Sequence, residues 1–123
     1  MRGKRRPPDA SADSLTALLD AFAHGDLGAA AGCFSADATY REPCRSALAG
    51  REVIAAHFAR FAASGIAWTF TVDEVITNGT RACVVYRFSA SGGEGEPRRE
   101  RAGCAVVRID ERGEIAEWRE YEG

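Results

Sequence analysis

The run "IAWTFTVDEVITNG" at residues 66–79 decides the fold class, because the spacing of the apolar side chains changes there. Its apolar residues stand at every second position, at Ile66, Trp68, Phe70 and Val72. Such alternation is typical of a β-strand that buries one face. The dipeptide Asn78-Gly79 follows, and it is a strong signal for a hairpin turn. The run therefore predicts a strand that turns back into an antiparallel sheet.

Three more strands are predicted after this hairpin turn, near residues 81–91, 98–109 and 114–122. The glycine-rich segment "SGGEGEP" (91–97) and the turn sequence "DERG" (110–113) separate them. Four consecutive strands with turns between them indicate an antiparallel meander.

Before residue 66 the apolar residues recur at helical spacing. This spacing predicts helices over residues 11–25, 26–34 and 50–65, with a short extended segment, "DATYREP", at 37–43. A run of helices followed by a run of strands favours an α+β fold. We therefore expect three N-terminal helices packed on one face of a curved, mixed or antiparallel sheet.

The length and composition point to one domain. The chain has 123 residues, enough for a single core. Residues 1–10 combine basic side chains with two prolines, and we expect them to form a disordered basic tail ahead of a folded domain at 11–123.

The charge pattern and the cysteines narrow the function classes. With 18 acidic and 16 basic residues the net charge is −2, and no basic stripe follows the tail, so we expect no nucleic acid partner. No apolar run reaches the roughly 18–20 residues that cross a membrane, and the N-terminus lacks a signal peptide, so we expect no membrane partner and a cytoplasmic location. Four scattered cysteines lack metal-ligand spacing, so we expect no metal and no cofactor.

Three segments carry a resemblance to a known family. The segments are "GDLGAAAGCFSADATYREP" (25–43), "LAGREVIAAHF" (48–58) and "IAEWREYEG" (115–123). Together with the order of elements, they resemble the SnoaL-like and nuclear transport factor 2-like superfamily, which includes ketosteroid isomerases, limonene epoxide hydrolases and polyketide cyclases. The resemblance implies a cone-shaped α+β barrel with a deep apolar cavity between sheet and helices, often in a homodimer.

Glu42 is the first candidate for chemistry, because it falls where ketosteroid isomerases carry their general base. Burial at a cavity mouth would raise its pKa toward neutrality, as such a base requires. The alternative is a solvated loop carboxylate paired with Arg41 or Arg45. The resemblance also places Leu18 and Ala105 where the isomerases carry the donors of their oxyanion hole, which argues against steroid isomerisation by the known arrangement.

The epoxide hydrolases supply a second set of candidates. The resemblance aligns Tyr40, Arg87 and Glu120 of this chain with a tyrosine, an arginine and an acid of these enzymes. Ser89 stands where these enzymes carry a further acid. Arg87 lies in an apolar strand and must find a partner. It either faces the cavity and pairs with Glu120 or Glu42, or it forms an ion pair on the outer face with an acid of the neighbouring strand, such as Glu100.

Four residues are candidates for contact with a substrate: His57, Trp68, Ser89 and Trp118. His57 lies on the apolar stripe of the third helix, where a hydrogen-bonded core or rim histidine is the simpler interpretation. The two tryptophans are first of all core or interface aromatics, although Trp118 shares strand parity with Glu120.

These observations favour a small cofactor-free enzyme of the isomerase, cyclase or hydrolase class, acting on an apolar, oxygenated small molecule. Its acid/base catalysis would use Glu42, Tyr40, Arg87 and Glu120. Two alternatives stay open, a non-catalytic module that binds a hydrophobic small molecule and a dimerisation scaffold whose cavity is filled by its own side chains.

Overall fold

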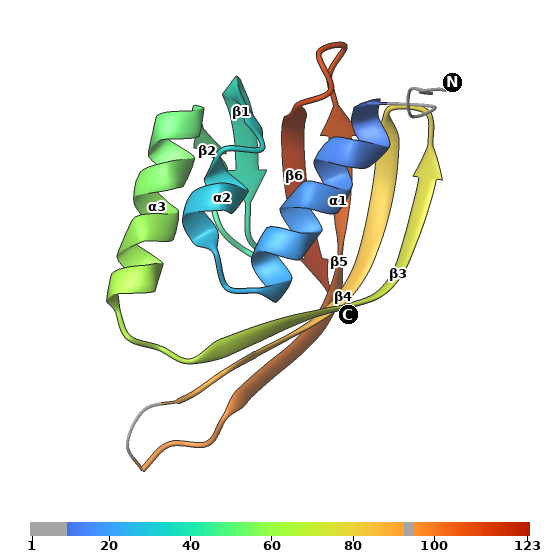
Figure 1. Ribbon diagram of the computed structural model, residues 1–123. Coiled ribbons are helices and arrows are strands. Elements are labelled where there is room, and N and C mark those ends of the chain that lie inside the picture. Colours follow the sequence, from blue (N-terminus) through green and yellow to red (C-terminus); the bar gives the residue numbers. More distant parts are fainter. Residues whose placement is uncertain (1–9, 93–94) are drawn as a thin grey trace, which may run out of the picture.

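The computed structural model describes residues 10–92 and 95–123. Within them the helices are α1 (Ala10–Ala23), α2 (Leu27–Ala31) and α3 (Arg51–Ala63). The strands are β1 (Phe34–Arg41), β2 (Leu48–Ala49), β3 (Trp68–Asn78), β4 (Arg81–Ala90), β5 (Arg99–Ile109) and β6 (Ile115–Glu122). The helices cover one face of a strongly curved sheet (Figure 1). We call this covered face the inner face and the opposite one the outer face.

The described strands form one six-stranded sheet in the order β2-β1-β6-β5-β4-β3. β1 runs parallel to β6, and the other neighbours are antiparallel. The sheet is therefore mixed and open, with β2 and β3 at its edges. The predicted α+β class, with three helices on a curved sheet, is confirmed. The two-residue strand β2 was not predicted, and β1 begins at Phe34, inside the segment that the sequence assigned to the second helix.

The helices pack through the apolar stripes seen in the sequence. Leu18 on α1 and Ile54 on α3 are fully buried, and Phe22 and Phe58 are nearly so. Burying a side chain of this size contributes roughly 1.5–3 kcal/mol to stability. α1 ends before Gly25, whose φ of 74° lies in the left-handed region that glycine adopts at little cost.

The hairpin predicted at Asn78-Gly79 is present, because Asn78 lies opposite Arg81. Further back along β3 the alternation is broken by a bulge at Asp73. Val72 pairs with Tyr86 and Glu74 with Val85, so Asp73 is one residue too many for the partner strand. Residues after the bulge are displaced by one position, so Ile76 lies opposite Cys83 on the outer face of the sheet.

The core lies between the inner face and the helices, and aromatic rings dominate it. Trp118 on β6 is fully buried, and its ring meets Phe22 at 5.5 Å and Phe70 at 6.5 Å between centroids. Aromatic pairs in such geometries add stability beyond the area that they bury.

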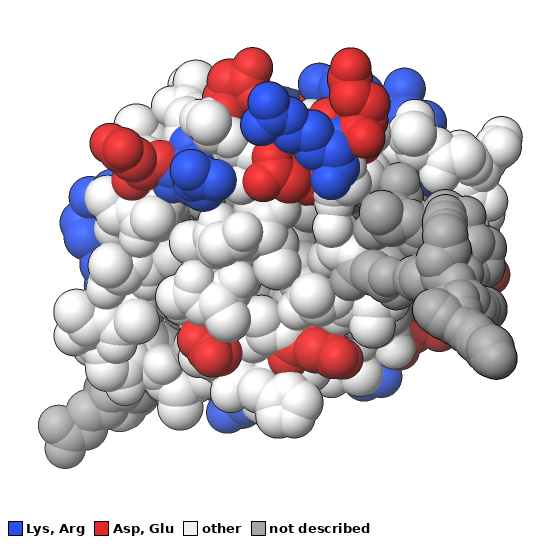
Figure 2. Space-filling model, turned by 45° about the horizontal axis from the view of Figure 1, so that its top comes forward, with Lys and Arg blue, Asp and Glu red and all other residues white. Residues whose placement is uncertain are grey.

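The surface carries charges of both signs. Figure 2 shows a face on which basic and acidic side chains lie beside each other and no area of one sign extends across it. The tail predicted over residues 1–10 lies outside the described residues, apart from Ala10 at the start of α1. In the part of the chain that the structure describes, no helix has the length and apolar character needed to cross a membrane.

Candidate functional site

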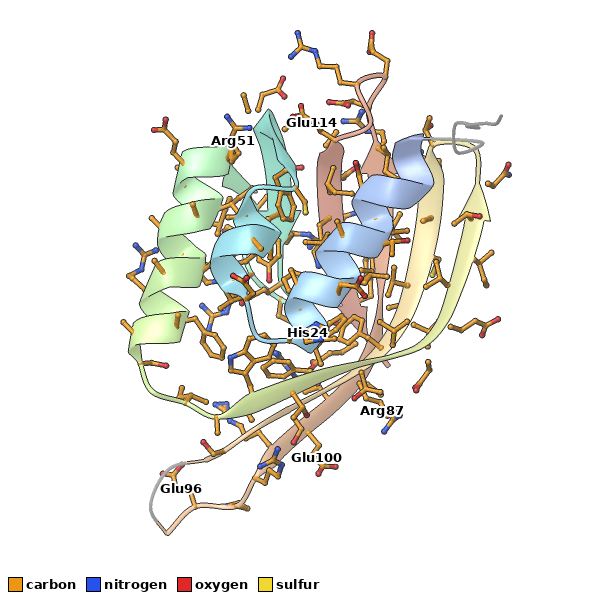
Figure 3. All side chains as sticks on the ribbon, viewed as in Figure 1. His24, Arg51, Arg87, Glu96, Glu100 and Glu114 are labelled. Atoms are coloured by element: carbon orange, nitrogen blue, oxygen red, sulfur yellow. The ribbon has the colours of Figure 1, made fainter. Side chains whose placement is uncertain are left out.

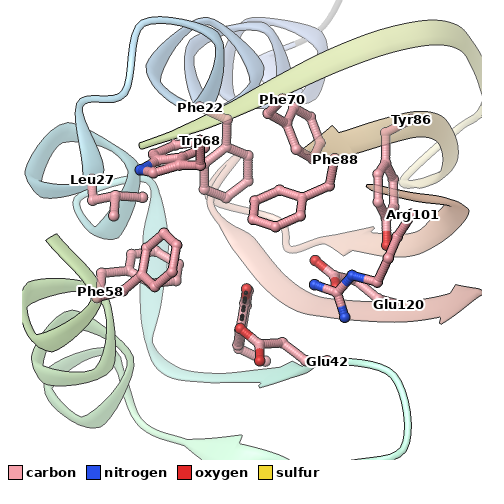
Figure 4. A pocket seen from close by; sticks show the side chains of 12 residues that line it. Phe22, Leu27, Glu42, Phe58, Trp68, Phe70, Tyr86, Phe88, Arg101 and Glu120 are labelled. Atoms are coloured by element: carbon pink, nitrogen blue, oxygen red, sulfur yellow. Dashed lines mark hydrogen bonds between the residues drawn. The ribbon is translucent and has the colours of Figure 1, made fainter. Parts of the chain in front are cut away.

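A cavity of about 80 Å³ opens between the helices and the inner face of the sheet (Figure 4). It has room for several water molecules. Most of its wall is apolar or aromatic, formed by Phe22, Leu27, Phe58, Phe61, Trp68, Phe70 and Phe88. The polar part of the wall consists of two tyrosines, two carboxylates and one arginine: Tyr40, Tyr86, Glu42, Glu120 and Arg101. Ionisable groups are therefore gathered in a largely apolar surrounding.

Glu120 is the more deeply buried of the two carboxylates. β6 directs it inward beside Trp118, two positions earlier, and it is 9% exposed. The indole Nε1–H of Trp118 donates to Glu120 Oε2 at 2.7 Å. Burial, with a smaller contribution from the charge of Glu42, raises the pKa of Glu120 to about 7 against the opposing effects of Trp118, Arg101 and Tyr86. Both protonation states of Glu120 are consequently populated near neutral pH.

Tyr86 stands next to Glu120 on the cavity wall. Burial, followed by the charge of Glu120, raises the pKa of the Tyr86 hydroxyl, which therefore stays protonated and can donate to Glu120. Gly103 leaves the space for this arrangement. A Cβ at Gly103 would lie 3.2 Å from the Tyr86 hydroxyl and 2.2 Å from the Tyr121 carbonyl oxygen, so a larger residue does not fit there without backbone movement.

Glu42 follows the end of β1, where Arg41 lies opposite Arg119 of the parallel strand β6, so it lines the cavity on the same side as Glu120. Its Oε2 accepts a hydrogen bond from the Tyr40 hydroxyl at 3.1 Å, and His57 Nε2 lies 2.9 Å from the same oxygen. A carboxylate only accepts, so an N–H at His57 Nε2 donates to it. Arg45 is a distant partner, with its Nε 3.9 Å from Glu42 Oε1. The sequence left two interpretations of Glu42 open, a position at the cavity and a pairing with a nearby arginine in solvent. In the structure Glu42 lines the cavity and also approaches Arg45.

Tyr40 and His57 hold Glu42 in place. Tyr40 is buried, and burial, the charges of Glu120 and Glu42 and its hydrogen bond to Glu42 raise its pKa well above the ordinary value, so its hydroxyl remains a donor. The His57 ring packs against Tyr40, with 5.8 Å between ring centroids. His57 is a rim residue beside Glu42, lining an adjoining depression rather than the cavity itself.

Arg101 is a site residue that the sequence interpretation missed. Its guanidinium carbon lies 5.2 Å from the centre of the Phe88 ring, and its Nε is 3.3 Å from Glu122 Oε2. Figure 4 shows the guanidinium directed toward Glu120 and Glu42. The signal was present in the strand parity, because Arg101 stands in phase with the buried Ala105 and Val107.

The region around Arg101 is also a free edge. Pairing of β5 with β6 reaches only to Gly103, with one further bond from Gly123 N–H to the Ala102 carbonyl at 3.0 Å. Residues 99–101 therefore pair with β4 alone, and the charged run "PRRER" (97–101) to which they belong is of the kind that protects an exposed strand edge from aggregation.

Arg87 does not lie at the cavity, although the sequence offered it as a polarising group. Tyr86 and Phe88 take the inward positions of β4, so the residue between them faces outward (Figure 3). Arg87 Nη2 lies 2.9 Å from Asp73 Oδ1, and Arg87 Nε contacts both oxygens of that carboxylate. The outer-face ion pair is the alternative that holds, with the bulge residue Asp73 as partner.

Ser89 and Trp118 also differ from their predicted roles as substrate contacts. Ser89 shares the outer face with Arg87, where its hydroxyl accepts from Arg98. Trp118 is fully buried and does not line the cavity, and it acts on the site through its hydrogen bond to Glu120. Trp68 does line the cavity, stacked on Phe88 at 6.1 Å between ring centroids.

The described residues do not form a metal-binding site. Among residues 10–92 and 95–123, no three His, Cys, Asp or Glu side chains are grouped so that they could hold a metal ion. What the arrangement offers chemically is proton transfer between two carboxylates and a bound molecule.

Comparison with protein-family models gives one match, to the SnoaL-like domain over residues 15–118. The chain belongs to this family. The match spans most of the described residues, from the middle of α1 to Trp118 on β6. No protein with a curated description matches the chain significantly.

Solved structures share the fold of this SnoaL-like protein. An LEH-like epoxide hydrolase from M. tuberculosis is 19% identical, with a TM-score of 0.76 over 93% of this chain and 83% of that one. The epoxide hydrolase/cyclase-like enzyme SalBIII, which acts in pyran ring formation in the polyether salinomycin, is 16% identical, with a TM-score of 0.77 over 92% and 90%. A protein with a ketosteroid isomerase-like fold from Catenulispora acidiphila, solved with trimethylamine, is 20% identical, with a TM-score of 0.75 over 94% and 86%.

Proposed function

We propose that this SnoaL-like protein is a cofactor-free enzyme that opens a strained ring or closes a new one in an apolar, oxygenated small molecule. Its general acid is Glu120 and its general base is Glu42. The observation that carries the proposal is the placement of Glu120 in the cavity wall, with a pKa of about 7, in the same cavity as a second carboxylate. An acid with such a pKa can give up and regain its proton at neutral pH.

The reaction that fits this pair is the opening of an epoxide by a hydroxyl group. Glu120 gives its proton to the epoxide oxygen as the carbon–oxygen bond breaks. Glu42 takes the proton of the attacking hydroxyl as the new carbon–oxygen bond forms. Glu42 then holds a proton and Glu120 has lost one, and transfer of that proton from Glu42 to Glu120 through a cavity water completes the cycle. Water as nucleophile gives a diol, and a hydroxyl of the substrate itself gives a cyclic ether.

Three neighbours position the two carboxylates for these transfers. Trp118 fixes the orientation of Glu120 through its 2.7 Å hydrogen bond. Tyr40 and His57 both approach Glu42 Oε2, at 3.1 Å and 2.9 Å. Glu42 Oε1 makes no closer polar contact, in the part of the chain that the structure describes, than the 3.9 Å approach of Arg45. That oxygen is therefore the one available to a nucleophile.

The fold relatives support ring chemistry over steroid isomerisation. Two of them are described as an epoxide hydrolase and an epoxide hydrolase/cyclase-like enzyme. The positions that the resemblance assigned to the isomerase oxyanion hole hold Leu18 and Ala105, both fully buried and apolar. An enolate formed in this cavity would lack those donors.

The proposal is tested with apolar epoxides. Limonene oxide, styrene oxide and an epoxide bearing an internal hydroxyl are incubated with the protein, and products are quantified by mass spectrometry. We expect turnover of at least one, with kcat reduced about 100-fold or more in Glu120→Gln and in Glu42→Gln. Arg87→Gln on the outer face is the matched control and should keep full activity. Activity should decline as the pH rises through about 7, because Glu120 loses the proton that it must donate.

The outcomes separate the proposal from its main alternative. Binding without turnover of any of these epoxides supports the non-catalytic binding module instead. Unchanged kcat in Glu120→Gln removes Glu120 from the mechanism.

We further propose that the protein forms a homodimer through the outer face of its sheet. Ile76 is 55% and Tyr121 42% exposed, and Val85 and Val106 lie between them on the same face. Charged residues of both signs, such as Arg108 and Glu117, border this apolar strip, so a second copy meets no uniform repulsion.

A further inference from the structure

The inner face of β5 changes in chemical character along the strand. From Gly103 to Ile109 its inward positions are small or apolar, at Gly103, Ala105, Val107 and Ile109. Toward the other end, the next two inward positions are Arg101 and Arg99, which lie opposite Phe88 and Ala90 of β4. The same face that lines the apolar cavity thus continues into two arginines. Consecutive inward positions of a strand are separated by roughly 6.6 Å.

A second hollow, of about 460 Å³, adjoins the cavity at this end of the sheet. The two share Glu42, Phe88 and Arg101, so the hollow forms the mouth of the cavity. Five of its lining residues are charged, namely Arg45, Arg99, Arg101, Glu42 and Glu96. Among the lining residues that the structure describes, arginines outnumber carboxylates by three to two.

Of the two carboxylates at the mouth, the one that also lines the cavity already has partners of its own. Glu42 is held by Tyr40 and His57, and only weakly by Arg45. Arg101 uses its Nε toward Glu122, and its terminal nitrogens are directed toward the cavity (Figure 4). A guanidinium carries five donors arranged to bind a carboxylate through two of them at once. Within residues 10–92 and 95–123, the mouth therefore offers donors that its own acids do not occupy.

We propose that the substrate is an amphiphilic carboxylate, whose apolar body lies in the aromatic cavity and whose carboxylate binds at the mouth against Arg99 and Arg101. This inference rests on the proposed function and names the substrate class for it. The order of groups along β5 sets the orientation of the molecule, because a carboxylate among the aromatic rings of the cavity would lose its hydration with no cation beside it. At Arg99, one inward position beyond Arg101, it is attracted while the apolar part stays among Phe70, Phe88 and Trp68.

Two pairs of probes that differ only in charge test the inference, 2-naphthoate against 2-naphthamide and octanoate against octanamide. Dissociation constants are measured by isothermal titration calorimetry in 50 mM and 500 mM salt. We expect each carboxylate to bind about fivefold more tightly than its amide at low salt, with the ratio falling at high salt. In the double variant Arg99→Gln/Arg101→Gln the ratio should fall to about one, because the carboxylate loses more affinity than the amide.

Arg87→Gln is the matched control, because it removes the same charge from the outer face of the sheet and should leave the ratio intact. Unfolding of each variant is followed by circular dichroism, so that a folding defect is distinguished from a lost contact. Equal binding of carboxylate and amide by the wild type overturns the inference and leaves the proposed function standing. A ratio that survives in the double variant also overturns it, since the arginines then serve only to protect the strand edge. Failure of all four probes to bind at millimolar concentration counts against the inference as well.

Discussion

The two faces of the sheet carry similar charged residues in opposite environments. On the inner face, burial raises the pKa of Glu120 to about 7. On the outer face, a hydrogen bond from Arg87 lowers the pKa of Asp73, an exposed carboxyl group. One carboxyl group is thereby suited to exchanging a proton near neutrality, and the other stays ionised. What a carboxyl group can do in this protein depends on the side of the sheet on which it lies.

The arginines show the same contrast. Arg101 lies over Phe88 at the mouth of the cavity and acts on the pKa of Glu120. Arg87, one residue away from Phe88 in the sequence, is 61% exposed at its side chain and is occupied by Asp73. Variants on each of the two faces test this difference.

Removing the indole from the inner face should destabilise the protein most. Trp118→Ala leaves a void among Phe22 and Phe70 and removes the donor to Glu120, so we expect a loss of about 4 kcal/mol in the free energy of unfolding, measured with urea. Trp118→Phe, which keeps much of the volume, should cost about half as much. Tyr121→Ala is the matched outer-face variant and should cost about 1 kcal/mol or less. Similar losses in Trp118→Ala and Tyr121→Ala would mean that the two faces do not differ in burial.

The raised pKa of Glu120 should make stability depend on pH. Because the folded state holds this proton up to pH about 7 whereas the unfolded chain releases it near the ordinary value of 4.5, the folded state binds more protons between these limits. Its contribution to stability therefore falls as the pH rises from 4.5 to 7, by about 3 kcal/mol, and is constant above. Urea unfolding of Glu120→Gln across this range should lack that component.

Asp73 provides the control of opposite sign. Its pKa is lowered, so its contribution is present above the ordinary value of 3.8 and disappears only as the pH falls further. Asp73→Asn should consequently leave the pH dependence between 4.5 and 7 unaltered. If Glu120→Gln behaves like Asp73→Asn in this range, Glu120 is not desolvated as described.

An acid placed on the outer face should change association more than folding. Ile76→Asp introduces a charge on the apolar strip, and we expect a shift from dimer to monomer in analytical ultracentrifugation. Because Ile76 is 55% exposed, the unfolding free energy of the monomer should change by only about 1 kcal/mol. Val84→Asp on the inner face is the contrast, since a buried charge there should prevent stable folding. A wild-type protein that sediments as a monomer would contradict the dimer proposal.

The smallest effect is expected for Arg87→Gln. The ion pair with Asp73 is exposed, and exposed pairs contribute little because water and salt screen them. The urea midpoint for unfolding of Arg87→Gln should therefore match that of the wild type within the error of the titration. A clear destabilisation would show that the bulge at Asp73 depends on this contact.

Much of the fold could be read from the sequence, because periodicity reports directly which side chains are buried. The helical stripe around Leu18 and the alternation through Phe70 and Val72 both lead to the observed elements. Two features could not be read in this way. β2 has only two residues, too few for any period. The bulge at Asp73 shifts the alternation by one, and the sequence does not reveal which residue of β3 is the extra one.

The bulge at Asp73 also determines which side chains of β3 lie on the outer face of the sheet. Counting alternate residues from Val72 would place Ile76 with the inward set, whereas it lies opposite the outward Cys83. The exposed apolar strip on the outer face is thus partly a product of one extra residue in β3.

Part of the candidate site was predicted, because alternation along a strand indicates on which face a side chain lies. Glu42 and Glu120 both line the cavity, and the parity of Trp118 with Glu120 is observed. Arg87 was assigned by resemblance to an arginine in a relative, although Tyr86 and Phe88 already indicated an outward position for it. Arg101 was hidden within a run of charges that suggested only a solvent-exposed edge. Its role depends on its distance from the core in three dimensions, which strand parity alone does not give.

The free edge of β5 has a practical consequence for experiments with fused sequences. The N–H of Gly123 already bonds to the Ala102 carbonyl, so residues attached after Gly123 would extend β6 along the unpaired backbone of Arg101 and Arg99. A C-terminal purification tag would then run across the entrance that the ligands are proposed to use. Assays of binding and turnover should accordingly be made with the tag removed, and a tagged sample that binds more weakly would reveal the same edge by competition.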